Sequence, residues 1–127
     1  MKQETKQKIF DQVSKHLLTQ MQSSISESNG CLYRGPNNTK CAIGCLIPDS
    51  LYSPDIENSI VRSLVKMEAY EKFFCELLEV DKISEQDIVF LQNLQDIHDN
   101  SETHDWLNNL ECFADENDLK QESLNGN

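Results

Sequence analysis

Apolar residues recur at spacings of three and four along most of this chain, which is the period of an amphipathic helix. The clearest example is the stripe that contains Ile9, Val13 and Leu17. Five segments follow such a pattern, at about residues 3–23, 53–65, 70–80, 84–99 and 103–114. We therefore expect a mainly α fold, a single compact domain of about five helices.

Local signals mark the starts of two of these helices. Ser84 followed by Asp87 three residues later is close to a capping box at the start of the fourth segment. Ser53 followed by Pro54 suits an N-cap and a first helical position. The second helix is therefore expected from Ser53, although Ser59 is an alternative start.

The segment CLYRGPNNTKC, residues 31–41, places turn-forming residues between two short β-like runs. We expect one small β-hairpin there. The following AIGCLI is expected to form one buried helical turn that ends before Pro48. Cys41, Ile43 and Leu46 are expected to pack on the apolar stripe of the fourth and fifth helices, which contains Leu91, Leu94 and Trp106.

The length of 127 residues fits one domain with a core of its own. We expect this domain to cover residues 1–118 and the polar remainder, 119–127, to form a flexible tail. No run of about 18 apolar residues occurs, so no membrane span is expected. The polar N-terminal segment lacks an apolar signal region, which predicts a cytoplasmic location.

The charge of the chain is strongly negative, at −11, from 22 acidic and 11 basic residues. Such a surface repels nucleic acid and attracts a basic protein partner. Residues 81–118 hold eleven of the acidic side chains and, besides histidines, only one cation, Lys82. The expected partner-binding residues lie in this part of the chain and are Asp96, Asp99, Glu102 and Asp105.

Five cysteines in a reducing compartment argue against a disulfide framework. The paired spacing typical of zinc sites is missing, so we expect no metal and no cofactor. If a metal were bound, its ligands would be Cys31, Cys41, Cys45 and His98. A nucleophilic Cys41 beside Lys40 is a further alternative. With no recognisable set of catalytic residues, the sequence favours a protein that is not an enzyme.

The hairpin is the candidate ligand site, because it presents an aromatic ring and two cations on an acidic background. Arg34 and Lys40 could hold a phosphate, and Tyr33 could stack on the base of a nucleotide. In the alternative, Arg34 pairs with a carboxylate of the chain, such as Asp49 or Glu57.

Three stretches, HLLTQ, CLYRGPNNTKCAIGCLIPDSLYSP and LQNLQDIHDN, followed by Trp106, resemble a family of small proteins encoded by phages, prophages and mobile elements. The resemblance extends from about Ile9 to Phe113. Its most distinctive pattern is C-x-Y-R followed by C-A-x-G and L-I-P-D. In that family the position of Cys45 is often aliphatic, which weakens a zinc site that uses this cysteine.

The resemblance implies an accessory protein that binds and inhibits a host or defence macromolecule. Such inhibition would occur either by mimicry of nucleic acid or by blocking a smaller basic patch through an apolar centre with a charged rim. A nucleotide-binding sponge that uses the hairpin is the alternative function, and a zinc- or thiol-dependent enzyme is the third.

Overall fold

The computed structural model describes residues 1–28 and 30–125, and within them five α-helices form the frame of the molecule. The helices are α1 (Gln3–Gln20), α2 (Val61–Leu64), α3 (Glu68–Leu78), α4 (Glu85–Asp99) and α5 (Trp106–Glu116). Strands β1 (Arg34–Gly35) and β2 (Thr39–Lys40) pair antiparallel, with Arg34 opposite Lys40. The expected mainly α fold with one small hairpin is confirmed.

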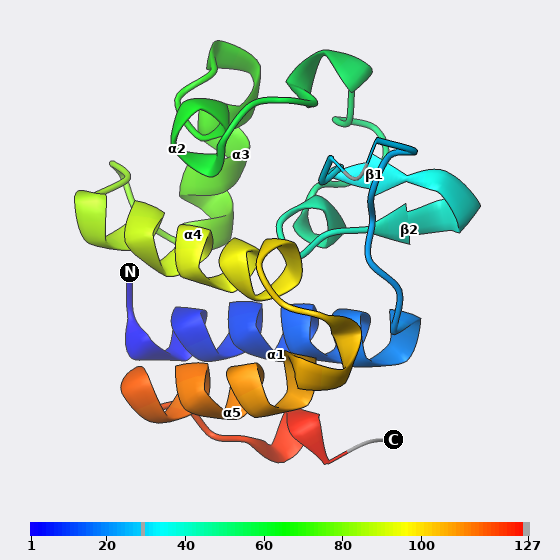
Figure 1. Ribbon diagram of the computed structural model, residues 1–127. Coiled ribbons are helices and arrows are strands. Elements are labelled where there is room, and N and C mark those ends of the chain that lie inside the picture. The colour runs from blue at the N-terminus through cyan, green and yellow to red at the C-terminus, as the bar shows by residue number, and fades with distance from the viewer. Residues whose placement is uncertain (29, 126–127) are drawn as a thin grey trace.

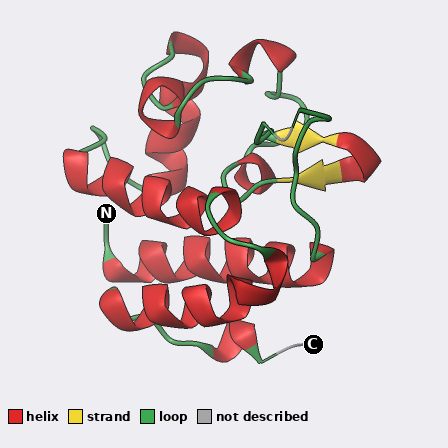
Figure 2. Ribbon diagram, in the orientation of Figure 1, coloured by secondary structure: helices red, strands yellow, loops and turns green. Residues whose placement is uncertain are grey.

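Short 3₁₀ turns occupy the connections between these elements. They are η1 (Pro36–Asn38), η2 (Gly44–Leu46), η3 (Pro54–Ile56), η4 (Thr103–Asp105) and η5 (Glu122–Leu124). The buried turn expected in AIGCLI is η2, which lies against α1. Figure 2 shows that helices dominate and that the hairpin is the only strand pair drawn.

Three long helices form the centre of the fold. Figure 1 shows α1 between α4 and α5, and these three helices pack pairwise against one another. Helices α2 and α3 and the hairpin lie on the opposite side of α4 from α5 in the same view. Phe10, Leu94 and Trp106 are fully buried, and the rings of Phe10 and Phe113 stack with centroids 5.8 Å apart. The apolar stripes of the sequence therefore meet in one core.

Local chemistry sets the ends of the long helices. Helix α1 ends when Met21 takes a left-handed backbone conformation, with φ of 47°, and donates its N–H to the carbonyl of Leu17. At the start of α4, Ser84 and Asp87 exchange side-chain to backbone hydrogen bonds. The expected capping box is therefore confirmed.

The long second helix expected over residues 53–65 is wrong. Ser53 does cap a helical turn, but that turn is η3 and stops at Ile56. Glu57 is extended, with ψ of 145°, and Asn58 is left-handed, with φ of 74°. Helix α2 then begins only at Val61, nearer to the alternative start at Ser59. The interruption coincides with a tertiary role of Glu57, described below.

Residues 119–125 do not extend away from the domain as a free tail. Leu119 and Leu124 are buried, and η5 packs against α1. The side chain of Gln7 donates to the carbonyl of Lys120 at 3.0 Å and accepts from its N–H at 2.8 Å. The expected domain boundary at residue 118 is therefore corrected, because these contacts extend the packed unit. Residues 126–127 of the expected tail lie outside the described part.

Within the described residues, no helix is long and apolar enough to cross a membrane.

Candidate functional site

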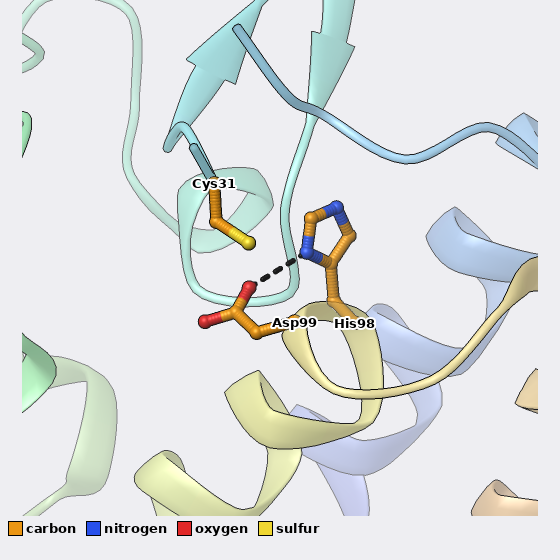
Figure 3. A group of neighbouring side chains, drawn as sticks. All are labelled: Cys31, His98 and Asp99. Atoms are coloured by element: carbon orange, nitrogen blue, oxygen red, sulfur yellow. Dashed lines mark hydrogen bonds and ion pairs between the residues drawn. The ribbon is translucent and has the colours of Figure 1, made fainter. Parts of the chain in front are cut away.

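The segment just before β1 and the end of α4 bring together a thiol, an imidazole and a carboxylate. Cys31 forms an isolated bridge with Ile25, and its side chain lies next to those of His98 and Asp99 (Figure 3). One potential ligand atom from each side chain lies within 4.8 Å of the other two. This thiol–imidazole–carboxylate cluster joins segments that are almost 70 residues apart in the chain.

Both ring nitrogens of His98 are engaged in hydrogen bonds. Nε2 accepts the backbone N–H of Ser24 at 2.8 Å, so this nitrogen carries a lone pair and no hydrogen. The hydrogen of the neutral ring is therefore on Nδ1, which donates to Oδ1 of Asp99 at 2.8 Å. His98 is buried and is held in one tautomer by these two partners.

The same carboxylate helps to connect α4 to the segment that follows the hairpin, residues 41–47. Oδ1 of Asp99 also accepts from the side-chain amide of Gln95 at 2.9 Å, and Oε1 of Gln95 accepts the backbone N–H of Ile43 at 2.9 Å. Gln95 and His98, both hydrogen-bonded to Asp99, thus accept the backbone N–H groups of Ile43 and Ser24. These hydrogen bonds hold the segments that contain Ser24 and Ile43 against α4.

The cluster is poorly suited to a metal ion. Nδ1 of His98, the nitrogen nearest Cys31 and Asp99, could ligate only after losing its hydrogen. A neutral ring would then carry that hydrogen on Nε2, where it would oppose the N–H of Ser24. Of the sequence-predicted ligands, Cys31 and His98 are brought together, but Cys41 and Cys45 are not part of this group. Cys41 is fully buried, and the thiol of Cys45 donates to the carbonyl of Ala42.

The surroundings of the thiols favour the protonated form. Partial burial of the side chain and the charge of Asp99 raise the pKa of Cys31 to about 11. Burial raises the pKa of Cys41 to about 12, and that of Cys45 to about 12. The hypothesis of a nucleophilic Cys41 is therefore corrected: the cost of desolvating a thiolate there outweighs the hydrogen bond donated by the Gly44 N–H.

We expect Cys31 to react slowly with alkylating agents even though the residue is exposed. A thiol whose pKa is about 11 is ionised in only about one molecule in a thousand at pH 8. Iodoacetamide should therefore label Cys31 at least about tenfold more slowly than the exposed Cys112 of α5, measured by peptide mass spectrometry. The Cys31 rate should rise as the pH approaches 11.

A matched pair of variants tests the role of the carboxylate in this prediction. Asp99→Asn should speed the labelling of Cys31, because it removes a negative charge that opposes the thiolate. Asp96→Asn, the same change one turn earlier on α4, should leave the rate unchanged. Equal labelling of Cys31 and Cys112 in the unmodified protein at pH 8 would contradict the prediction.

A small cavity of about 200 Å³ lies next to the cluster. Gln92, Gln95 and Asp99 of α4 line one part of it, and Cys31 and Tyr33 of the segment just before β1 line another. The polar groups of α4 are already used: Gln92 donates to Asp96, and Gln95 donates to Asp99.

The structure separates the three hairpin residues of the sequence-predicted nucleotide site. Tyr33 is not an exposed stacking platform but a core residue, 6% exposed, whose hydroxyl donates to the carbonyl of Ser59 at 2.5 Å. The guanidinium of Arg34 donates to Asp49 at 2.6 Å and to the carbonyl of Ile47 at 2.7 Å, and lies over the ring of Tyr52. The alternative pairing of Arg34 with Asp49 is therefore observed, and stacking on Tyr33 is excluded by its burial.

Glu57 has a role that the sequence did not reveal. Its two carboxylate oxygens accept the backbone N–H groups of Tyr33 at 2.9 Å and Arg34 at 3.1 Å, and one of them also accepts from the hydroxyl of Tyr52. From the sequence alone, Glu57 is expected only as a partner for the Arg34 side chain. Because the contact is to backbone atoms more than 20 residues away, no local pattern indicates it.

Lys40, the third predicted residue, lines a larger groove between the hairpin and α1. The groove has a volume of about 600 Å³ and is lined by Gln12, Lys15, His16, Thr19, Gln20, Asn38, Lys40 and Cys45. Within these lining residues two cations and several amides gather, and none is acidic. Lys15 was not predicted as a site residue, because on the sequence it is one of several lysines on the polar side of α1.

The acidic residues expected to bind a partner fall into two groups. Asp96 and Asp99 are half-buried and accept hydrogen bonds from glutamines of α4. Glu102 and Asp105 are exposed on either side of His104. Further exposed carboxylates follow on and just after α5, at Glu111, Asp115, Glu116 and Asp118.

No family model, curated protein or solved structure matched this chain.

Proposed function

We propose that this protein acts by binding a basic macromolecule through the acidic surface of α5. We define this surface as Glu102, Asp105, Leu107, Glu111, Asp115, Glu116 and Asp118. Within the described residues, none of its carboxylates forms an ion pair with a lysine or arginine of the chain. This group of exposed carboxylates without a lysine or arginine partner is the observation that supports the proposal.

The arrangement of side chains on α5 suits an interface. Leu107, Glu111 and Asp115 follow one another at a spacing of four and so share one side of the helix. Leu107 is 44% exposed, which places an apolar side chain among carboxylates. Interfaces commonly combine such an apolar centre with a charged rim, and the charge guides the encounter with a basic partner.

Inhibition of the bound partner is the outcome that we propose. It rests on the resemblance to accessory proteins of phages and mobile elements, which implies a host or defence macromolecule as the target. Two modes of inhibition are open, a block of a local basic patch and mimicry of nucleic acid. The exposed Leu107 favours the first, because nucleic-acid mimicry needs only the charges. A basic patch that contacts Leu107 would bury apolar surface as well as pair its charges.

The test is a charge reversal on α5 that the fold should tolerate. In the double variant Glu111→Lys, Glu116→Lys, both side chains are exposed, and a lysine near the C-terminus of a helix interacts favourably with the helix dipole. We expect the association rate with a basic partner to fall by about tenfold or more, and the wild-type rate to fall steeply with added salt. The partner is first captured from a lysate of the cells that make the protein, then purified for kinetics and for an assay of its own activity.

A matched double variant separates local contact from net charge. Glu71→Lys, Glu76→Lys has the same spacing, on a helix of the same length, and changes the net charge equally. We expect this control to reduce the rate much less, because α3 lies outside the proposed surface. Equal losses for the two variants, or a captured partner whose activity is unchanged by the protein, would contradict the proposal.

A further inference from the structure

We infer that the groove between α1 and the hairpin binds a phosphate-bearing small molecule, whose phosphate is held by Lys15 and Lys40. The inference is independent of the acidic surface of α5, since the groove is formed by other elements and has the opposite charge. It also replaces the hairpin site expected from sequence, of which only Lys40 remains available.

Among the described residues, neither lysine has a close acidic partner of its own. Within the described part of the chain, Lys15 forms no ion pair. The ammonium of Lys40 is 3.9 Å from Oδ1 of Asp49, an oxygen that Arg34 already binds at 2.6 Å. An ammonium that is only loosely paired can be offered to a phosphate, where its hydrogen bonds are charge-assisted.

The walls of the groove are held in place by hydrogen bonds that leave these ammonium groups uncommitted. The backbone N–H of Lys40 donates to Gln20 at 2.9 Å, and its carbonyl accepts from Gln20 at 2.9 Å and from His16 at 2.8 Å. These hydrogen bonds hold β2 against α1 through main-chain atoms of Lys40. Burial lowers the pKa of His16, so its ring contributes the wall of the groove and not a third cation at neutral pH.

The size and lining of the groove define the class of ligand. A volume of about 600 Å³ lies within the range of pockets for small molecules and cofactors. Thr19 and Asn38 add a hydroxyl and a carboxamide at the same groove. The only ring in its lining is that of His16, so recognition is directed at the phosphate and not at a stacked base.

The inference is tested by titrating the protein with pyrophosphate, AMP and adenosine while the backbone amide signals are monitored by NMR. Pyrophosphate and AMP should produce saturable shifts confined to the amides around residues 15–20 and 38–40, whereas adenosine should produce none. Lys15→Gln and Lys40→Gln should each weaken binding by about tenfold or more, because each removes a charge-assisted contact. Neither lysine side chain takes part in the contacts that hold the hairpin to α1, so both variants should fold.

The matched control is Lys72→Gln, which removes one positive charge from the exposed side of α3. It should leave the affinity for pyrophosphate unchanged. An absence of saturable shifts up to about 10 mM pyrophosphate would overturn the inference, because a dissociation constant above that concentration is too weak for specific recognition. So would equal weakening in Lys72→Gln, or adenosine shifts at the same amides.

Discussion

Replacing Gly44 with alanine is expected to destabilise the fold by about 3 kcal/mol or more, the upper part of the range for an overpacked core. A Cβ at residue 44 would lie 2.0 Å from the carbonyl oxygen of Tyr33 and 2.8 Å from its carbonyl carbon. The obstacle is therefore main chain, which cannot rotate away as a side chain could. The requirement for glycine here comes from close approach of two segments.

Tyr33 is unable to move aside cheaply, because it is held on several sides. Its N–H is bound by Glu57, its hydroxyl by the carbonyl of Ser59, and its ring is buried. A shift of Tyr33 that accommodates a methyl group at residue 44 would strain these contacts. Urea denaturation at neutral pH measures the loss directly.

Gly30→Ala is the matched control for this substitution. A Cβ at residue 30 would meet only the hydroxyl oxygen of Ser26, at 3.3 Å, which is the end of a small side chain. We expect a change within about 1 kcal/mol, since glycine to alanine also reduces the entropy of the unfolded chain. Similar stabilities for Gly44→Ala and the unmodified protein would contradict the close approach of η2 to Tyr33.

Leu46→Ala is expected to lower the free energy of unfolding by about 2 to 5 kcal/mol, the usual range for truncating a buried leucine. Leu46 is 5% exposed and belongs to η2, which packs against α1. The substitution removes apolar contacts and leaves a cavity that the surrounding helices fill only in part. Thermal and urea unfolding provide two independent measurements.

Leu107→Ala makes the same chemical change on the surface and serves as the control. Leu107 is 44% exposed, so little buried area is lost, and alanine suits a helix position. Its effect on stability is expected to stay within about 0.5 kcal/mol. An equal decrease in the free energy of unfolding for the two leucine variants would mean that η2 is not part of the core.

Much of the fold could be predicted because the relevant interactions are local. The apolar stripe of α1 follows from residues three and four apart, and the capping box of α4 joins Ser84 to Asp87 only three residues away. The hairpin follows from the turn chemistry of Pro36, Asn37 and Asn38, two of which adopt positive φ. Such patterns can be read from a single sequence, and the structure confirms them.

The errors arose where a distant contact overrode the local pattern. The segment 53–65 has helical spacing, yet Glu57 leaves the helical conformation and binds backbone N–H groups of the hairpin. The polar segment after residue 118 has the composition of a tail, yet Leu119 and Leu124 are buried and η5 packs against α1. Composition and periodicity contain no information about these partners.

The candidate sites depended still more on tertiary structure. The sequence by itself determined the helical fold, the hairpin and the acidic excess, because these depend on spacing along the chain and on summed charge. Only the tertiary structure decided that Tyr33 is buried, that Asp99 accepts a hydrogen bond from His98, and that Lys15 lines the same groove as Lys40. The physical reason is that availability of a side chain is set by what packs against it, and those neighbours come from segments far apart in the sequence.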